Sequence, residues 1–215
     1  MTPKAAIFGQ NAHPMLSVRQ LSCQRGERRL FAGVDFSLAA GEWLHVQGEN
    51  GAGKTTLLRA LVGLTPPLAG EIRWQGQPVG ELGEAWRRTL LYLGHLGALK
   101  EELTPLENLR CMTALDGDAA SERDLIAALV RFGLRGREEL PARVLSAGQK
   151  RRVLLARMAL GRAPLWVLDE PFTALDVKAV DLLCSVIDEH LQTGGLAILT
   201  SHQSLPLAGG RTIRL

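Results

Sequence analysis

Three short stretches of the chain are apolar at nearly every position. They are residues 89–93 (TLLYL), Leu165–Leu168 (LWVL) and Leu196–Thr200 (LAILT), and helical patterns separate them along the chain. A strand that is covered on both faces is apolar throughout and does not alternate. The pattern therefore predicts buried parallel strands with helices on both sides, which is an α/β fold.

A second group of strands is expected nearer the N-terminus. Residues 16–24, 30–38 and 71–75 alternate between apolar and polar positions or are rich in residues that favour strands. They lie close in sequence to a glycine-rich loop, which the short apolar strand Trp43–Gln47 precedes. We expect these segments to form a small antiparallel β lobe beside the parallel sheet.

Between residues 94 and 144 no convincing long strand is visible, and two helical patterns stand out instead. One starts at Pro105. The other has Ser121 as a plausible N-cap, with Asp124 three residues later, and stops at Gly133. We interpret residues 95–150, approximately, as an inserted α-helical lobe. Residues 1–14 have little periodicity and are expected to be a flexible N-terminal tail, which leaves residues 15–215 as one domain.

Composition narrows the class of protein. The 25 Lys and Arg residues nearly balance the 22 Asp and Glu residues, and the only clustered basic run is 150–152, so no nucleic-acid-binding face is indicated. Cys23, Cys111 and Cys184 are far apart and match no disulfide, zinc or haem-attachment pattern. No apolar run approaches the ~20 residues needed to span a bilayer. We expect a chain that is soluble by itself and reaches a membrane only through a partner.

The loop at residues 48–56 (GENGAGKTT) carries the strongest chemical signal. It fits the pattern of glycine, four free positions, glycine, lysine and a hydroxyl residue, between a predicted strand and a predicted helix. Glycines let successive N–H groups turn toward one concavity, Lys54 supplies charge for the β/γ-phosphates and Thr55 offers a hydroxyl to Mg²⁺. The candidate nucleotide-binding residues are Gly48, Glu49, Asn50, Gly51, Ala52, Gly53, Lys54, Thr55 and Thr56.

Two adjacent acids follow the apolar strand in LWVLDEP. Adjacent side chains on an extended chain point in different directions, so Asp169 can hold Mg²⁺ while Glu170 polarises the water that attacks the γ-phosphate. The alternative is a pair of surface acids at a strand end. His202 follows the next strand in LTSHQ, where it can contact the γ-phosphate and the water. The candidate catalytic residues are Glu170, His202 and Lys54.

Residues 145–149 (LSAGQ) begin a further helical pattern and resemble the LSGGQ signature of the ATP-binding subunits of ABC transporters, with Ala147 in place of the first glycine. The other motifs follow in the order of that family, with residues 173–176 (TALD) as the D-loop and His202 as the switch histidine. The resemblance runs from residue 16 to residue 215. It implies a P-loop NTPase fold with a RecA-like parallel core, and ATP with Mg²⁺ as ligands.

The resemblance also implies a homodimer of ATPase subunits arranged head to tail. In such a dimer the phosphate loop of one subunit and Ser146, Gly148 and Gln149 of the other enclose one ATP, and Asp176 crosses the interface. Two positions depart from the family pattern. His95 stands where the family has a glutamine that reaches Mg²⁺ or the water, and Arg25 stands where an aromatic residue stacks on adenine, with Phe31 nearby.

Within the family, the chain is similar to the ATPases of bacterial cytochrome c maturation. The features that carry this likeness are His95, LSAGQ, DEPFTALD, TSHQ and the final RTIRL. That likeness implies a peripheral subunit on the cytoplasmic face of the inner membrane, with integral membrane partners similar to CcmB and CcmC. ATP hydrolysis is there associated with release of a haem-loaded chaperone, and we expect no direct haem binding. The alternatives are a transporter subunit for another solute or lipoprotein, and a soluble ABC ATPase that scaffolds cofactor assembly.

The segment that follows His95 is where a membrane partner's helix docks in the family. Leu96, Leu99 and Leu103 are candidates for that contact. The alternative is that they belong to the core of the helical lobe.

Overall fold

The three apolar runs form three adjacent strands of a parallel sheet, from its edge to its centre. The computed structural model describes residues 14–94, 99–117, 120–201 and 207–215. In these residues β6 (Leu90–Leu93), β7 (Leu165–Leu168), β8 (Leu196–Thr200), β3 (Trp43–Gln47) and β9 (Arg211–Arg214) lie in that order, and every neighbouring pair is parallel. The predicted α/β class is confirmed.

The two faces of this sheet bury different side chains, as the period of a strand requires. Leu165 and Val167 of β7 belong to a core shared with α1 (Lys54–Leu61), whereas Trp166 and Leu168 belong to a core under the other helices. All four side chains are at most 3 % exposed. Burial on both faces explains why the strand is apolar at every position.

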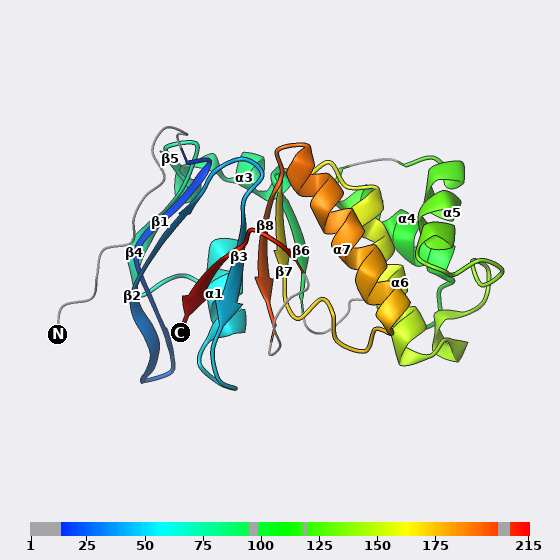
Figure 1. Ribbon diagram of the computed structural model, residues 1–215, viewed down its shortest axis with the longest axis horizontal. Helices are drawn as coiled ribbons and strands as arrows, with labels where there is room; N and C mark the ends of the chain where they lie inside the picture. The colour runs from blue at the N-terminus through cyan, green and yellow to red at the C-terminus, as the bar shows by residue number, and fades with distance from the viewer. Residues whose placement is uncertain (1–13, 95–98, 118–119, 202–206) are drawn as a thin grey trace.

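The predicted antiparallel lobe is a second sheet, drawn at the left of Figure 1. Its order is β2-β1-β4-β5. Helix α1 lies between the two sheets and contacts both β1 and β8 (Figure 1). The strands are β1 (Leu16–Arg25), β2 (Arg28–Leu38), β4 (Ala69–Trp74) and β5 (Gln77–Pro78), and the short helices α2 (Val79–Leu82) and α3 (Glu84–Arg88) follow them.

The helical lobe covers the opposite face of the parallel sheet (Figure 1). The predicted helix starts are correct, since Thr104 forms a capping box with Glu107 and the Ser121 hydroxyl accepts from the Asp124 N–H at 3.2 Å. Leu99 is partly buried against the core of this lobe, which favours the core alternative for that residue. The lobe contains α4 (Pro105–Leu115), α5 (Glu122–Arg131), η1 (Ala142–Val144) and the start of α6 (Ala147–Ala156), and η2 (Arg157–Ala159) and α7 (Val177–Gln192) follow it along the chain and contribute to the same core.

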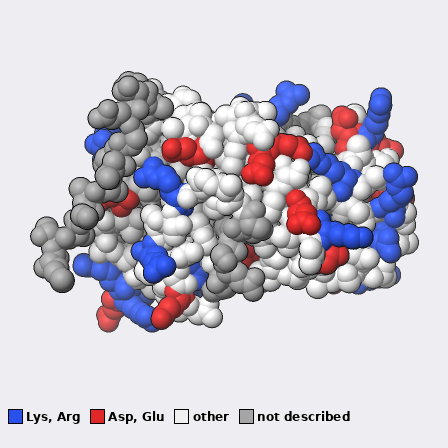
Figure 2. All heavy atoms as spheres, in the orientation of Figure 1, with Lys and Arg blue, Asp and Glu red and all other residues white. Residues whose placement is uncertain are grey.

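Opposite charges are interspersed on the face of the molecule that Figure 2 shows. Ion pairs also join separate segments of the chain, including Arg131 with Glu189 and Lys150 with Glu101, at 2.6 and 2.5 Å. Among the described residues, no helix is both long and apolar enough to cross a membrane. Leu96 and the tail expected at residues 1–14 lie outside the described residues, except for Pro14.

Candidate functional site

The phosphate loop connects the end of β3 to the start of α1, as predicted. Gly51 and Gly53 have φ of 80° and 107°, which residues with a side chain rarely adopt. A Cβ on Gly53 would also lie 3.0 Å from both Leu30 Cβ and Phe31 Cδ1, and a Cβ on Gly48 would lie 3.1 Å from that of Ala52. Gly51 and Gly53 therefore permit the turn, and Gly53 also permits the close approach of the first hairpin.

Lys54 is the first residue of α1 and its side chain folds back over the loop. Its Nζ donates to the carbonyl oxygens of Gly48 at 2.7 Å and Glu49 at 3.1 Å, and the residue is 7 % exposed. The ammonium group is thus held against the loop, at the positive end of the α1 dipole. This concentration of positive charge suits the phosphates of a nucleotide.

Asp169 follows β7 and is almost completely buried, at 1 % exposure. Its Oδ2 accepts a hydrogen bond from the Thr55 hydroxyl at 2.8 Å, and its Oδ1 accepts one from the Thr200 hydroxyl at 2.6 Å. A carboxylate and a hydroxyl are the oxygen ligands that Mg²⁺ takes in nucleotide sites, so Thr55 and Asp169 fit that ion. In the described residues no group of three or more His, Cys, Asp or Glu side chains could hold a metal ion.

Thr200 is a site residue that sequence reasoning missed. It lies at the end of β8 with 0 % exposure, and its hydroxyl accepts from the Glu170 N–H at 2.8 Å while donating to Asp169. The strand order places β8 between β7 and β3, which brings Thr200 between the acids and the phosphate loop. Its polar side chain at the end of an apolar strand was the available signal.

Glu170 points away from its neighbour, as expected for adjacent residues. It is partly exposed, with φ of 49°, and its Oε2 lies 3.5 Å from the Thr173 hydroxyl. Positive φ is uncommon for residues other than glycine and is found at functional sites. The two acids are therefore in different environments, Asp169 buried under two hydroxyls and Glu170 partly exposed beside Thr173.

The signature segment begins α6. Ser146 is the N-cap, and it exchanges hydrogen bonds with Gln149 in a capping box: the Ser146 hydroxyl accepts from the Gln149 N–H and the Gln149 side chain accepts from the Ser146 N–H. A Cβ on Gly148 would lie 3.0 Å from the Ala174 carbonyl oxygen. The start of α6 is thus packed against the D-loop of the same chain.

Asp176 caps α7, with its Oδ1 accepting from the Ala179 N–H at 2.9 Å, and its Oδ2 forms an ion pair with Arg152 at 2.6 Å. These contacts lower the pKa of its carboxyl group, the backbone hydrogen bond most strongly. Asp176 is therefore ionised near neutral pH and is anchored to α6.

A hollow of about 570 Å³ adjoins the phosphate loop. Arg25 is not among its described lining residues, but Arg28 is. The two face each other in the β1–β2 pairing, so they belong to one hairpin end. His95 and His202 lie outside the described residues. The lining residues are Arg28, Gln47, Gly48, Glu49, Asn50, Gly51, Ala52, Ser201, Arg214 and Leu215.

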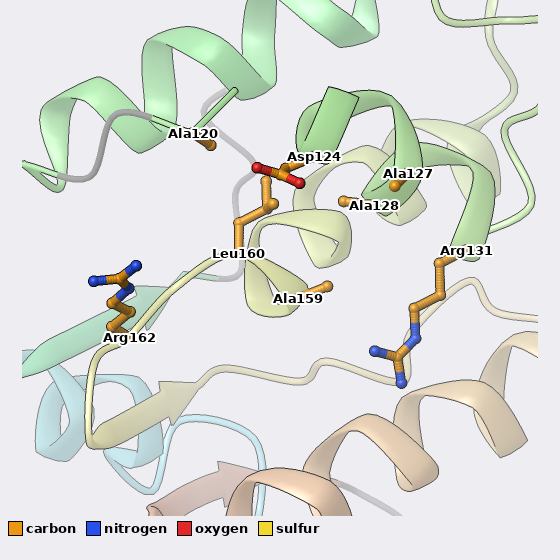
Figure 3. Close-up of a pocket in the computed structure, with 8 residues that line it drawn as sticks. All are labelled: Ala120, Asp124, Ala127, Ala128, Arg131, Ala159, Leu160 and Arg162. Atoms are coloured by element: carbon orange, nitrogen blue, oxygen red, sulfur yellow. The ribbon is translucent and has the colours of Figure 1, made fainter. Parts of the chain in front are cut away.

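A slightly larger hollow, of about 620 Å³, lies in the helical lobe (Figure 3). Its walls are small side chains of α5 and η2, with Arg131 and Arg162 projecting from opposite sides in Figure 3. None of the predicted site residues lines it. Cavity size therefore does not identify the nucleotide site, which is marked by chemistry at the edge of the sheet.

Several known proteins are similar to this chain. A family model described as "ABC transporter" matches residues 31–173. The Cytochrome c biogenesis ATP-binding export proteins CcmA of Dechloromonas aromatica and Shigella flexneri are 57 % and 51 % identical to this chain, over 94 % of it and over 100 % and 95 % of their own lengths.

Solved structures agree on the fold. A putative ABC transporter ATP-binding protein from Pyrococcus furiosus superimposes with a TM-score of 0.81 at 26 % identity, over 93 % of this chain and 96 % of its own. The cassette MJ0796, solved as a dimer bound to ADP and Pi, gives 0.76 at 22 % identity, over 88 % of each chain. The fold and site therefore define an ABC-type ATPase. The chain belongs to the ABC transporter family and, within it, to the CcmA proteins.

Proposed function

We propose that the chain powers a membrane export complex of cytochrome c biogenesis by binding and hydrolysing ATP, in the step that releases a haem-loaded chaperone. The structural observation that best supports this function is the hydrogen bond between Thr55 and Asp169, because it joins the phosphate loop to the acids that follow β7. The name shared by the relatives of similar length supplies the pathway.

The phosphate loop residues 48–56 bind the triphosphate through backbone N–H groups and the Lys54 ammonium. Thr55 and Asp169 hold Mg²⁺, which neutralises charge on the β- and γ-phosphates when it is bound. In this assignment His95 also belongs to the Mg²⁺ environment, in place of the family's glutamine.

Glu170 accepts a proton from the attacking water. The water oxygen forms a new bond to the γ-phosphorus, the bond from that phosphorus to the bridging oxygen breaks, and ADP leaves with the electron pair. His202 bonds a γ-phosphate oxygen and the same water. The partial exposure and positive φ of Glu170 support its role, because they direct the carboxylate out of the protein core.

A second copy of this chain completes the site. Ser146, Gly148 and Gln149 are not among the described residues that line the hollow at the phosphate loop of their own chain, which supports a role toward a nucleotide held by a partner. The dimeric form of MJ0796 supports this arrangement. Asp176 lies beside the start of α6 and contacts the partner across the same interface.

The membrane partners are integral proteins similar to CcmB and CcmC, on the cytoplasmic face of the bacterial inner membrane. The chain itself binds neither haem nor nucleic acid in this proposal. A subunit for another solute or lipoprotein, and a soluble scaffold for cofactor assembly, remain the rival functions. Co-purification with an integral membrane protein supports the transporter, and isolation with only soluble partners contradicts it.

The test of the site is Glu170→Gln. The variant should bind ATP with unchanged affinity and hydrolyse it about 10²-fold or more slowly, since it loses the general base. Lys54→Ala is the matched comparison, because it should lose affinity together with turnover. ATP binding by fluorescence and phosphate release by a coupled assay separate the two. Wild-type turnover in Glu170→Gln would exclude Glu170 from the role.

A further inference from the structure

Arg151 is a buried arginine whose guanidinium lies behind the two acids. It belongs to α6, two residues after the signature segment, and is 9 % exposed. Its Nη2 donates to the carbonyl oxygen of Glu170 at 2.8 Å and to that of Asp169 at 3.2 Å. A side chain of the helical lobe thus holds the backbone of the acidic turn.

The remaining backbone groups of this turn are held by the parallel sheet. The Asp169 N–H donates to the Leu93 carbonyl at 2.8 Å, and the Glu170 N–H donates to Thr200. The carbonyl groups face the other way, toward Arg151. A left-handed conformation, with φ of 49° at Glu170, is unfavourable for a residue with a side chain, so it persists only where its surroundings fix it. From outside the sheet, the Glu170 carbonyl is held by Arg151 and by the Thr173 N–H, which donates to it at 3.2 Å, and Arg151 is the side chain among these donors.

Charge reinforces the contact. Burial lowers the pKa of the Arg151 guanidinium, and the carboxylates of Asp169 and Glu170 oppose that effect. An arginine stays protonated under these conditions. Its positive charge therefore lies close to both acids, while its hydrogen bonds go to their main chain.

We infer that Arg151 is a positioning residue that sets the orientation of Glu170 and links it to the signature end of α6 in the same chain. The inference rests on the proposed function of both segments. In the proposed dimer, Ser146–Gln149 contacts the nucleotide held by the partner, while Arg151, on the same short helix, holds Glu170 of its own site. Movement of α6 upon closure over one ATP is thereby passed to the catalytic carboxylate of the other.

The first measurement compares Arg151→Met, Arg151→Lys and a control, Arg157→Met, in the full-length chain. Arg157 follows the same helix but pairs with Asp116, within the helical lobe. Arg151→Met should leave ATP affinity within about 2-fold and lower kcat about 10- to 100-fold, the effect of a misplaced catalytic group. Arg151→Lys should recover part of the rate because it keeps a charged donor. Loss of ATP affinity equal to the loss of kcat, or an equal loss in the control, would overturn the inference.

A double-variant cycle separates positioning from general damage. If Arg151 acts through Glu170, Arg151→Met should change the residual rate of Glu170→Gln by less than about 2-fold. Full additivity of the two losses means that Arg151 acts elsewhere and overturns the inference, while Glu170 keeps its role. A Glu170→Gln variant with wild-type turnover defeats the proposed function instead. Should Arg151→Met fail to fold by circular dichroism, the same cycle is run with Arg151→Lys.

Discussion

The Thr55 hydroxyl and the Asp169 carboxylate are hydrogen-bonded at 2.8 Å although 114 positions separate them in the sequence. The Thr200 hydroxyl donates a hydrogen bond to the other oxygen of the same carboxylate. With both oxygens bonded, the buried carboxylate has one orientation, and desolvation of its charge is offset by two hydroxyl donors. The carboxylate that we propose as a Mg²⁺ ligand is therefore oriented by side chains of the protein itself.

Replacing Thr200 by Val should damage the site without changing its shape. The substitution removes the donor to Asp169 and leaves the Glu170 N–H without its acceptor. Because a buried polar group left unbonded costs about 1–3 kcal/mol, the free energy of unfolding should fall by that amount. We expect kcat to fall by about 10-fold or more. Urea unfolding and steady-state ATP hydrolysis measure the two effects.

Thr200→Ser is the matched control, since it keeps the hydroxyl and loses only a methyl group. It should retain most of the activity and lose less stability than Thr200→Val. If Val and Ser behave alike, the hydroxyl is not what orients the acids.

Gly53→Ala should be more harmful than Gly51→Ala. Both glycines have positive φ, so each substitution carries a backbone cost of about 1–2 kcal/mol. A new Cβ meets nothing within 4 Å at Gly51, but at Gly53 it approaches Leu30 Cβ and Phe31 Cδ1 to 3.0 Å. ATP affinity and melting temperature should therefore fall further in Gly53→Ala. Equal losses would mean that the contact with the first hairpin does not shape the loop.

The sequence predicted most of the fold because its signals are local. Uniformly apolar strands, alternation in the first lobe and the N-cap at Ser121 each depend on neighbouring residues, and all are found in the structure. The phosphate loop and the Asp169–Glu170 pair were recognisable for the same reason. In both motifs the residue types and their spacing are enough to predict nucleotide chemistry.

The residues that were missed depend on contacts between distant segments. Thr200 reaches the acids only because β8 lies between β7 and β3. The sequence of a single strand does not show which strands lie beside it in the sheet. Arg151 lies in a helical stretch that resembles an ordinary exposed basic run, and its burial comes from docking of α6 against the acidic turn. Arg28, which the hairpin brings to the hollow, was likewise not singled out.

Arg28 should contribute more to ATP affinity than Arg25. It lines the hollow beside the phosphate loop, and a guanidinium can stack on a base or bind a phosphate. We expect Arg28→Ala to weaken ATP binding by about 3- to 10-fold, the effect of an exposed charge on an anion. Arg25→Ala is the matched comparison across the strand pair. If only Arg25→Ala lowers ATP affinity, Arg25 stacks on the adenine and Arg28 does not. Titration of both variants with ATP and with inorganic triphosphate distinguishes contacts to the base from contacts to the phosphates.

Two histidines should make the fold sensitive to mild acid. Burial lowers the pKa of His45, which is 4 % exposed, and that of His190, which stacks on Trp166 at a centroid distance of 3.7 Å. The unfolded chain then binds protons that the folded chain does not, beginning near the ordinary histidine pKa of about 6.5. The free energy of unfolding should therefore fall as the pH drops below about 6.5, and the loss continues down to the lowered pKa of each folded imidazole.

The slope of the free energy of unfolding against pH should be at most about 1.4 kcal/mol per pH unit for each histidine. Urea unfolding at intervals between pH 8 and pH 5 measures it, and His45→Gln and His190→Gln should each flatten the curve because glutamine does not titrate. Carboxylates with a lowered pKa, such as Asp176 and Glu189, act in a separate window below their ordinary values near 4. An unchanged slope in the variant with both substitutions would mean that other groups cause the acid sensitivity.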